Sequence, residues 1–221
     1  ERVLYVDDGT GAVDLVVDRD DPDTLYAAMY EKHRSDWQLV LGGPGTGVYK
    51  SRDGGDRWER LEGGLPSGDL GRIGLDLNRK SGVLHAVIEN VNPRPEGWPA
   101  RHDACSPDRE IRGNTIGNEV YRSDDGGATW RKTHGDEIDV AGSKAPYSFN
   151  QILTNPSDPD QIIIRLARSR PAGTLGCCSY RPLVHIQCGR RPRAANKERM
   201  WLKDRRGIIL LHEKNCAVSQ Q

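Results

Sequence analysis

The feature that most constrains the fold of this 221-residue chain is an eight-residue motif that occurs twice. The first motif covers residues 51–58 and the second motif covers residues 123–130, and each follows a Val-Tyr pair and a basic residue. Their shared residues are Ser51, Asp53, Gly55 and Trp58 in the first motif and Ser123, Asp125, Gly127 and Trp130 in the second. Repetition over tens of residues is typical of propellers, solenoids and arrays, which stack one small unit several times.

Each motif is predicted to form the turn of a β-hairpin. The β-branched and aromatic residues of the lead-in favour a pleated strand. The Asp-Gly-Gly core that follows supplies the positive φ angles that tight turns require. Asp53 and Asp125 are expected to accept hydrogen bonds from backbone N–H groups inside their turns. Trp58 and Trp130 are expected to pack between neighbouring sheets.

The pattern Ser-x-Asp-x-Gly-x-x-Trp resembles the Asp box, or BNR repeat, of sialidases, xyloglucanase-type glycosidases and the sortilin luminal domain. The resemblance implies a β-propeller blade in which this turn lies at the periphery, away from the central site. The motif residues are therefore expected to stabilise the fold rather than to act in catalysis. Because one fold hosts many activities, the resemblance does not name a reaction.

Further strands are predicted before each motif, and the fold class is therefore all-β. They are expected at residues 12–17 and 24–30, at 72–77 and 83–88, and in a third unit at 147–153 and 161–164. Four short strands in meander order make a propeller blade. Residues 1–164 are thus predicted to form a propeller segment of about two and a half antiparallel blades.

Four further segments resemble large bacterial BNR-repeat proteins of the glycosyl-hydrolase or sortilin-like type. They are residues 6–15, 21–29, 42–47 and 64–74. The resemblance extends over roughly residues 3–164 and implies a location outside the cytoplasm, extracellular or periplasmic. Since the chain has no signal peptide and a closed propeller needs about 4–8 blades, we expect it to be a fragment of a larger protein.

Two long insertions, residues 31–46 and 89–117, interrupt the repeat. The second contains four prolines, which are expected to exclude regular sheet: Pro93, Pro95, Pro99 and Pro107. It also contains His102, Asp103, Cys105 and Asp108, whose spacing does not match a metal site. The glycine-rich residues 42–47 lack the Lys-Ser/Thr pair of a phosphate-binding loop. We therefore expect no metal and no cofactor.

The chain changes character near residue 165. Residues 1–164 contain 19 Lys and Arg against 29 Asp and Glu, whereas residues 165–221 contain 13 against 3. Four of the five cysteines also lie in this C-terminal part. Three interpretations of this basic, Cys-containing tail remain open. It could be an anion-binding or nucleic-acid-binding extension, or a zinc module. It could also be an abnormal continuation, such as a shifted reading frame, and the tail would then be irregular. Nucleic-acid binding is the less favoured of the partner classes, because the tail has few aromatic residues for base stacking.

Candidate site residues are taken from the ends of the predicted inner strands, which line the axis of a propeller. Glycoside hydrolysis would require a pair of carboxylates, and the candidates are Asp69 together with either Asp7 or Asp8. Arg72, Tyr147 and Asn150 are the candidate ligand-binding residues. The alternative for the three aspartates is that they cap turns and solvate the loop ends.

Two functions follow from these residues. The first is a non-catalytic propeller segment that binds polypeptide or glycan partners through its loops. The alternative is a fragment of a secreted glycosidase-like hydrolase, with a fold of the sialidase or xyloglucanase type. No segment approaches the length of a transmembrane helix, so we expect no membrane partner. Open blade edges predict self-association.

Overall fold

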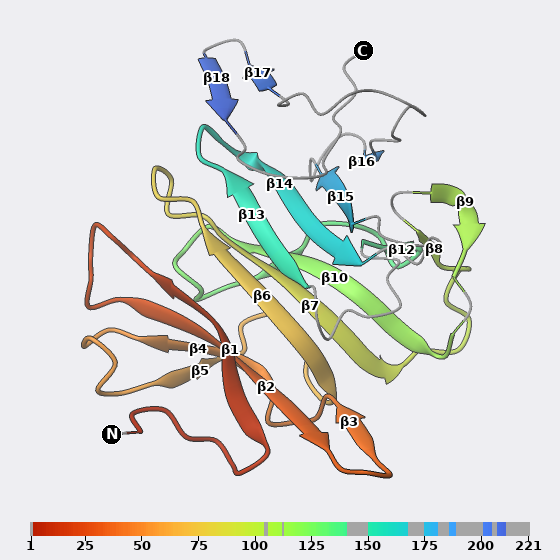
Figure 1. The fold of residues 1–221 in the computed structure, drawn as a ribbon, viewed down its shortest axis with the longest axis horizontal. Helices are drawn as coiled ribbons and strands as arrows, with labels where there is room; N and C mark the ends of the chain where they lie inside the picture. The colour runs from red at the N-terminus through yellow and green to blue at the C-terminus, as the bar shows by residue number, and fades with distance from the viewer. Residues whose placement is uncertain are drawn as a thin grey trace.

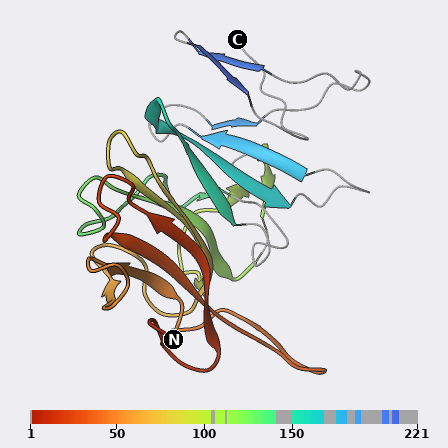
Figure 2. The same cartoon turned by 60° about the vertical axis from the view of Figure 1, so that its left-hand side comes forward.

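All of the regular structure in the described part of the chain is β-strand. The structure is a computed structural model, and it describes residues 2–103, 106–111, 113–140, 150–167, 175–180, 186–188, 201–204 and 207–210. Three antiparallel sheets follow one another along the chain, and Figure 2 shows them as successive layers. Among the described residues, no helix is long and apolar enough to span a membrane.

The first sheet is a meander with one additional strand. Its main path is β1 (Thr10–Val17), β2 (Leu25–Arg34), β4 (Gly47–Ser51) and β5 (Glu59–Leu61), and β3 (Leu39–Leu41) pairs with the far end of β2. Residues 31–46 therefore contain a hairpin extension of β2 rather than an irregular insertion.

The second sheet repeats this meander. It consists of β6 (Leu70–Leu77), β7 (Leu84–Pro93), β10 (Thr115–Ser123) and β11 (Arg131–Lys132). Two consecutive four-stranded antiparallel meanders make the described fold an all-β, partial β-propeller.

The structure corrects the prediction that residues 89–117 exclude regular sheet. β7 continues to Pro93, where a proline at the strand end removes no needed hydrogen bond. A small sheet follows, made of β8 (His102–Asp103), β9 (Ser106–Glu110) and β12 (Ile138–Asp139). Cys105 lies outside the described residues, and no metal-binding group of His, Cys, Asp and Glu occurs among those that are described.

The third sheet extends across the predicted boundary near residue 165. β13 (Gln151–Asn155) pairs with β14 (Asp158–Ala167), and the described backbone adds β15 (Leu175–Tyr180) and β16 (Ile186–Cys188). A separate hairpin is formed by β17 (Trp201–Asp204) and β18 (Gly207–Leu210). The third sheet therefore has two strands more than the sequence pattern predicted.

The inner strands of the three sheets are neighbours, because β6 packs against both β1 and β13 (Figure 1). An aspartate on β1 and another on β6 join these inner strands by hydrogen bonds. Asp14 Oδ2 accepts a hydrogen bond from the Leu75 N–H at 2.9 Å, and Asp76 Oδ2 accepts one from the Thr154 N–H. Gly74 permits this close approach, since a Cβ on it would lie 2.3 Å from the Asn150 carbonyl oxygen.

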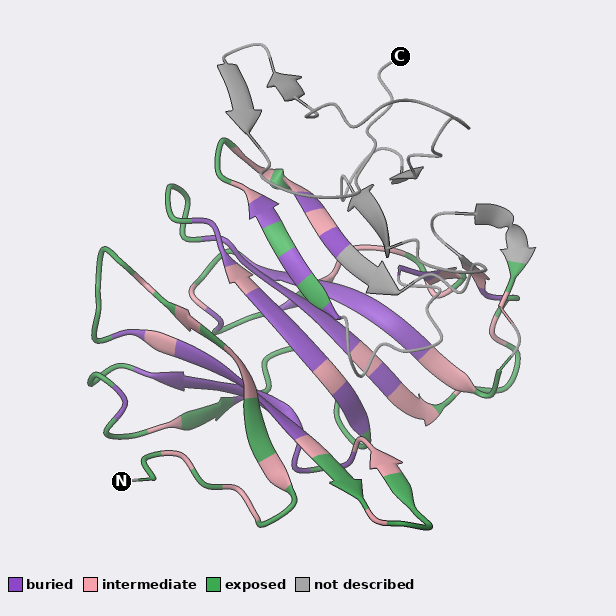
Figure 3. Ribbon diagram, in the orientation of Figure 1, coloured by how far each residue is buried: buried purple, intermediate pink, exposed green. Residues whose placement is uncertain are grey.

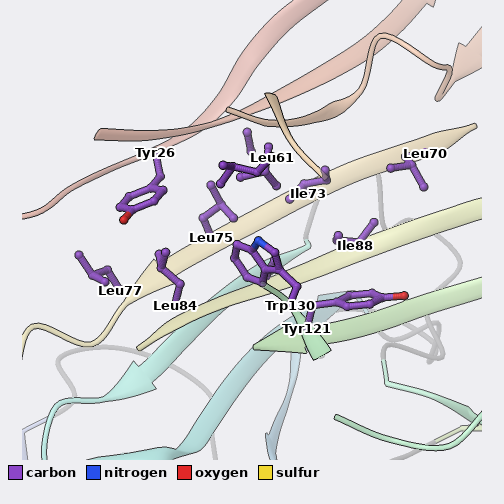
Figure 4. Packing of buried hydrophobic residues seen from close by; sticks show 13 residues of the cluster. Tyr26, Leu61, Leu70, Ile73, Leu75, Leu77, Leu84, Ile88, Tyr121 and Trp130 are labelled. Carbon is purple, nitrogen blue, oxygen red and sulfur yellow. The ribbon is translucent and has the colours of Figure 1, made fainter. Parts of the chain in front are cut away.

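Two hydrophobic clusters fill the spaces between the sheets. The larger cluster lies between the first and second sheets and includes Tyr26, Leu61, Ile88 and Trp130 (Figure 4). The smaller cluster lies between the second and third sheets. The second sheet is consequently buried on both faces, whereas Leu15 and Val17 leave apolar surface exposed on β1 (Figure 3).

The two motifs form the same turn, bond for bond. In the first motif, Ser51 Oγ donates to Asp53 Oδ1 at 2.8 Å and accepts from the Gly55 N–H at 2.9 Å. Trp58 Nε1 closes the turn by donating to the Gly55 carbonyl at 2.8 Å. Positive φ angles of 71° and 101° at Gly54 and Gly55 allow this path. Ser51, Asp53 and Gly55 are thus bonded to one another within the turn.

The second motif repeats each of these bonds. Ser123 Oγ donates to Asp125 Oδ1 at 2.8 Å and accepts from the Gly127 N–H at 2.8 Å. Trp130 Nε1 donates to the Gly127 carbonyl at 3.0 Å. Hydrogen bonds from Thr129 and Ser123 lower the pKa of Asp125 to about 2, so the turn holds this carboxylate in its charged form.

The two motifs nevertheless lie in different surroundings. Trp130 is 6% exposed and belongs to the larger hydrophobic cluster, as predicted. Trp58 is only half-buried and belongs to neither cluster of the described residues, so the prediction that it packs between sheets is not met there. The reason is position: the second motif packs on the first sheet, where Gly126 accepts hydrogen bonds from Lys50 and Tyr26.

Candidate functional site

The candidate site lies at the end of the sheets where β1 and β6 begin, which we call the loop end. The strand registers bring the starts of β1, β4, β6 and β10 and the final residues of β2 and β7 to this end. Both motif hairpins connect strands at the opposite end. One end of the propeller segment therefore carries the repeated turns, and the other end carries the candidate site residues.

The predicted carboxylates Asp7, Asp8 and Asp69 all lie at the loop end, but in separate settings. Asp7 Oδ1 accepts from the Gly9 N–H at 2.8 Å, and Asp8 Oδ1 accepts from the Tyr5 hydroxyl at 2.9 Å. Asp69 is exposed on the next sheet. No hydrogen bond joins any two of these three described residues. Their catalytic role stays a prediction.

Two of the three predicted ligand-binding residues are in contact. Asn150 Nδ2 donates to the Arg72 carbonyl oxygen at 2.9 Å, so the start of the third sheet is fixed to β6. Asn150 is 1% exposed. Tyr147 lies outside the described residues.

Next to this contact is a carboxyl group that the sequence analysis did not select. Glu89, near the end of β7, accepts a 3.4 Å hydrogen bond from the Arg72 N–H. Burial raises the pKa of Glu89 to about 7, and the nearby carboxylate of Asp139 adds to the rise. The Arg72 N–H opposes the rise without cancelling it. Glu89 therefore changes its charge near neutral pH.

Asn118 lies directly opposite Glu89 on β10, and its side chain bonds to one member of a buried ion pair. Asn118 Nδ2 donates to Asp139 Oδ1 at 3.2 Å, and Arg101 Nε lies 3.6 Å from Asp139 Oδ2. The Arg101 and Asp139 side chains are 6% and 5% exposed. Arg101 is also anchored by hydrogen bonds to the carbonyls of Thr115 and Ile116.

The result is a continuous polar cluster, which we call the Glu89 cluster. Four of its members lie on β6, β7, β10 and β12, and the other two lie just before β8 and β13; together they are Arg72, Glu89, Asn118, Asp139, Arg101 and Asn150. The side-chain oxygens of Asn118 and Asn150 are buried and accept no hydrogen bond within the part of the chain that the structure describes. Since buried acceptors are normally paired, these two oxygens mark the cluster as a place for a donor group or a water molecule.

Sequence reasoning found only Arg72 and Asn150 of this cluster. The sequence analysis placed Glu89 in the insertion because it follows the predicted strand at residues 83–88, whereas β7 continues through Glu89 to Pro93. Asn118, Asp139 and Arg101 have no local signal, since each reaches the cluster through strand pairing over long sequence distances.

Comparison with known proteins gives structural matches only. No family model matches the chain, and no curated protein matches it. An ancestral GH74 enzyme is 15% identical over 81% of this chain and 20% of its own, with a TM-score of 0.48. A Hadza microbial sialidase is 17% identical over 81% of this chain and 37% of its own, with a TM-score of 0.44.

A protein of unknown function from Dyadobacter fermentans is 15% identical over 90% of this chain and 59% of its own, with a TM-score of 0.48. The chain thus spans less than two thirds of the length of each of these proteins. The assignment of the chain as a partial β-propeller rests on its own strand order.

Proposed function

We propose that the chain is part of an Asp-box (BNR-repeat) propeller and binds a polypeptide or glycan partner at the loop end without catalysing a reaction. The identical bonding of the two motifs supports the family assignment. The same assignment implies a location outside the cytoplasm. Since the chain spans only part of the proteins that it resembles, the proposal concerns recognition by this segment.

The observation that carries the proposal is the pair of side-chain amide oxygens of Asn118 and Asn150, which are buried and unpartnered among the described residues. Both side chains are fixed, because their amide N–H groups donate to Asp139 and to the Arg72 carbonyl. Fixed acceptors beside a carboxyl group whose pKa is raised to about 7 form a set that can pair with hydroxyl or amide donors of a ligand. Such preorganised polar groups give orientation and specificity to binding sites.

The predicted carboxylates support binding more than catalysis. Hydrolysis of a glycosidic bond requires two carboxyl groups about 5–10 Å apart on either side of the bond. Asp7 and Asp8 each accept a local hydrogen bond, and Asp69 is exposed.

One specific observation favours the alternative, a glycosidase-like hydrolase. Glu89 and Asp139 are near each other in unlike environments, because Asp139 is paired with Arg101 whereas the Glu89 pKa is raised to about 7. Two carboxyl groups with separated proton affinities are the pattern of a general acid and its charged partner. In this alternative, Glu89 would protonate the leaving-group oxygen.

The test measures binding and turnover in one sample. The full chain is titrated with a xyloglucan oligosaccharide, with sialyllactose and with short peptides, while reducing-end sugar release is followed. Binding without release supports the proposal. Release that is lost in Glu89→Gln but kept in Asp8→Asn and Asp69→Asn would establish the hydrolase instead and identify Glu89 as its acid.

A further inference from the structure

A cavity of about 170 Å³ lies between the first and second sheets at the loop end. Its position follows from its walls, since they include the start of β4, the end of β5 and the start of β6. The inner walls are apolar and buried, and they are formed by Val48, Leu61, Leu70, Ile73 and Ile88. Exposed residues at its rim are Arg60, Glu62 and Ser67.

The lining favours an apolar group of about the size of a benzene ring. An apolar cavity of roughly 150 Å³ stays dry and accepts benzene. A sugar ring would exchange its hydrogen bonds with water for contacts with aliphatic side chains, which is unfavourable. The Arg60 guanidinium does not change this, because its two terminal nitrogens donate to the carbonyls of Pro44 and Thr46 at 3.0 and 2.8 Å.

The strand beside the cavity favours a polypeptide as the source of that apolar group. Arg60 and Leu61 line the cavity and belong to β5, which pairs only with β4 among the described strands. A strand at a sheet edge offers backbone N–H and C=O groups to an extended peptide. Peptides that add to such an edge gain affinity from the backbone and specificity from pockets that receive alternate side chains.

We propose that this cavity receives one apolar side chain of Phe or Leu size from an extended polypeptide that pairs along the edge of β5. The inference rests on the proposed recognition function and selects polypeptide over glycan as the partner of this cavity.

The experiment is an NMR titration of the full chain with acetyl-Val-Phe-Val-amide, acetyl-Val-Ala-Val-amide and a xyloglucan oligosaccharide. Burial of the phenyl ring predicts that the Phe peptide binds about tenfold to a hundredfold more tightly than the Ala peptide. Its chemical-shift changes are expected to centre on Val48, Leu61 and Ile73.

Two serine variants separate the cavity from general effects. Ser67→Trp obstructs the mouth without touching the buried walls, and it is expected to reduce affinity for the Phe peptide to that of the Ala peptide. Ser157→Trp, an exposed serine on the third sheet, is the matched control and is expected to change nothing. A circular dichroism spectrum confirms that each variant is folded.

Equal affinities for the Phe and Ala peptides, or full affinity in Ser67→Trp, would overturn the inference. Binding of the oligosaccharide without binding of either peptide would overturn it as well and leave the proposed recognition function intact. Failure of all three probes to bind would count against both.

Discussion

The two motif tryptophans give a matched pair for a stability measurement. Both indole N–H groups donate to the carbonyl of the motif's second glycine, so replacing either residue by alanine removes the same hydrogen bond. The variants differ in the packing that is lost. Trp130 is 6% exposed between two sheets, whereas Trp58 is half-buried on its own hairpin.

Trp130→Ala should therefore destabilise the chain by about 3–5 kcal/mol, the range for removing a fully buried large aromatic side chain. Trp58→Ala should cost about 1–2 kcal/mol, which is typical of a partly buried site. The difference of ~2 kcal/mol is the contribution of packing between sheets. Trp37→Ala, at a side chain that is 87% exposed, is the control and should stay within about 0.5 kcal/mol of the parent chain.

The assay is equilibrium unfolding in urea followed by circular dichroism. In the far ultraviolet this signal comes mainly from the backbone, so each variant can be compared with its own folded and unfolded baselines. Equal free-energy losses for Trp58→Ala and Trp130→Ala would refute the reasoning, because they would mean that the second motif does not pack against the first sheet. A loss below about 1 kcal/mol for Trp130→Ala would do the same.

Three further outcomes are expected. Burial raises the folded pKa of Glu89 to about 7 from 4.5, so the stability that its protonated form provides is lost as pH rises from 4.5 through 7. Glu89→Gln should therefore stabilise the chain by ~1–3 kcal/mol at pH 8 and have little effect at pH 4, as measured by urea unfolding at both pH values. Burial lowers the pKa of His85 to about 4 from 6.5, so stability should fall as pH drops from 6.5 towards 4, and thermal melts of His85→Gln should lose this dependence. Leu15→Ser combined with Val17→Ser should reduce self-association through the open face of β1, and an unchanged light-scattering mass would contradict that prediction.

Local patterns in the sequence were sufficient for the repeated turns and most strand positions. The alternation of Ile73, Leu75 and Leu77 predicted β6, and the structure confirms a strand at Leu70–Leu77. The motif hairpins were predictable because Ser, Asp and Gly act within a few residues of one another. The different burial of Trp58 and Trp130 was not predictable, since it depends on which sheet lies beside each hairpin.

The candidate site was less accessible to prediction for the same physical reason. Arg72 and Asn150 were selected because each lies near the start of an inner strand. Glu89 meets Asn118 and Asp139 only through strand pairing and the small sheet that contains β12. Its raised pKa is a property of burial, which no local sequence pattern reveals.

The central claim is that recognition belongs to the loop end and that the motif hairpins at the other end support the fold. The most direct test is to map chemical-shift changes over the isotope-labelled full chain on addition of acetyl-Val-Phe-Val-amide and, separately, of a xyloglucan oligosaccharide. The account predicts changes near Leu61, Asp69 and Glu89, with residues 51–58 and 123–130 unaffected. Changes confined to the two motif hairpins would contradict it.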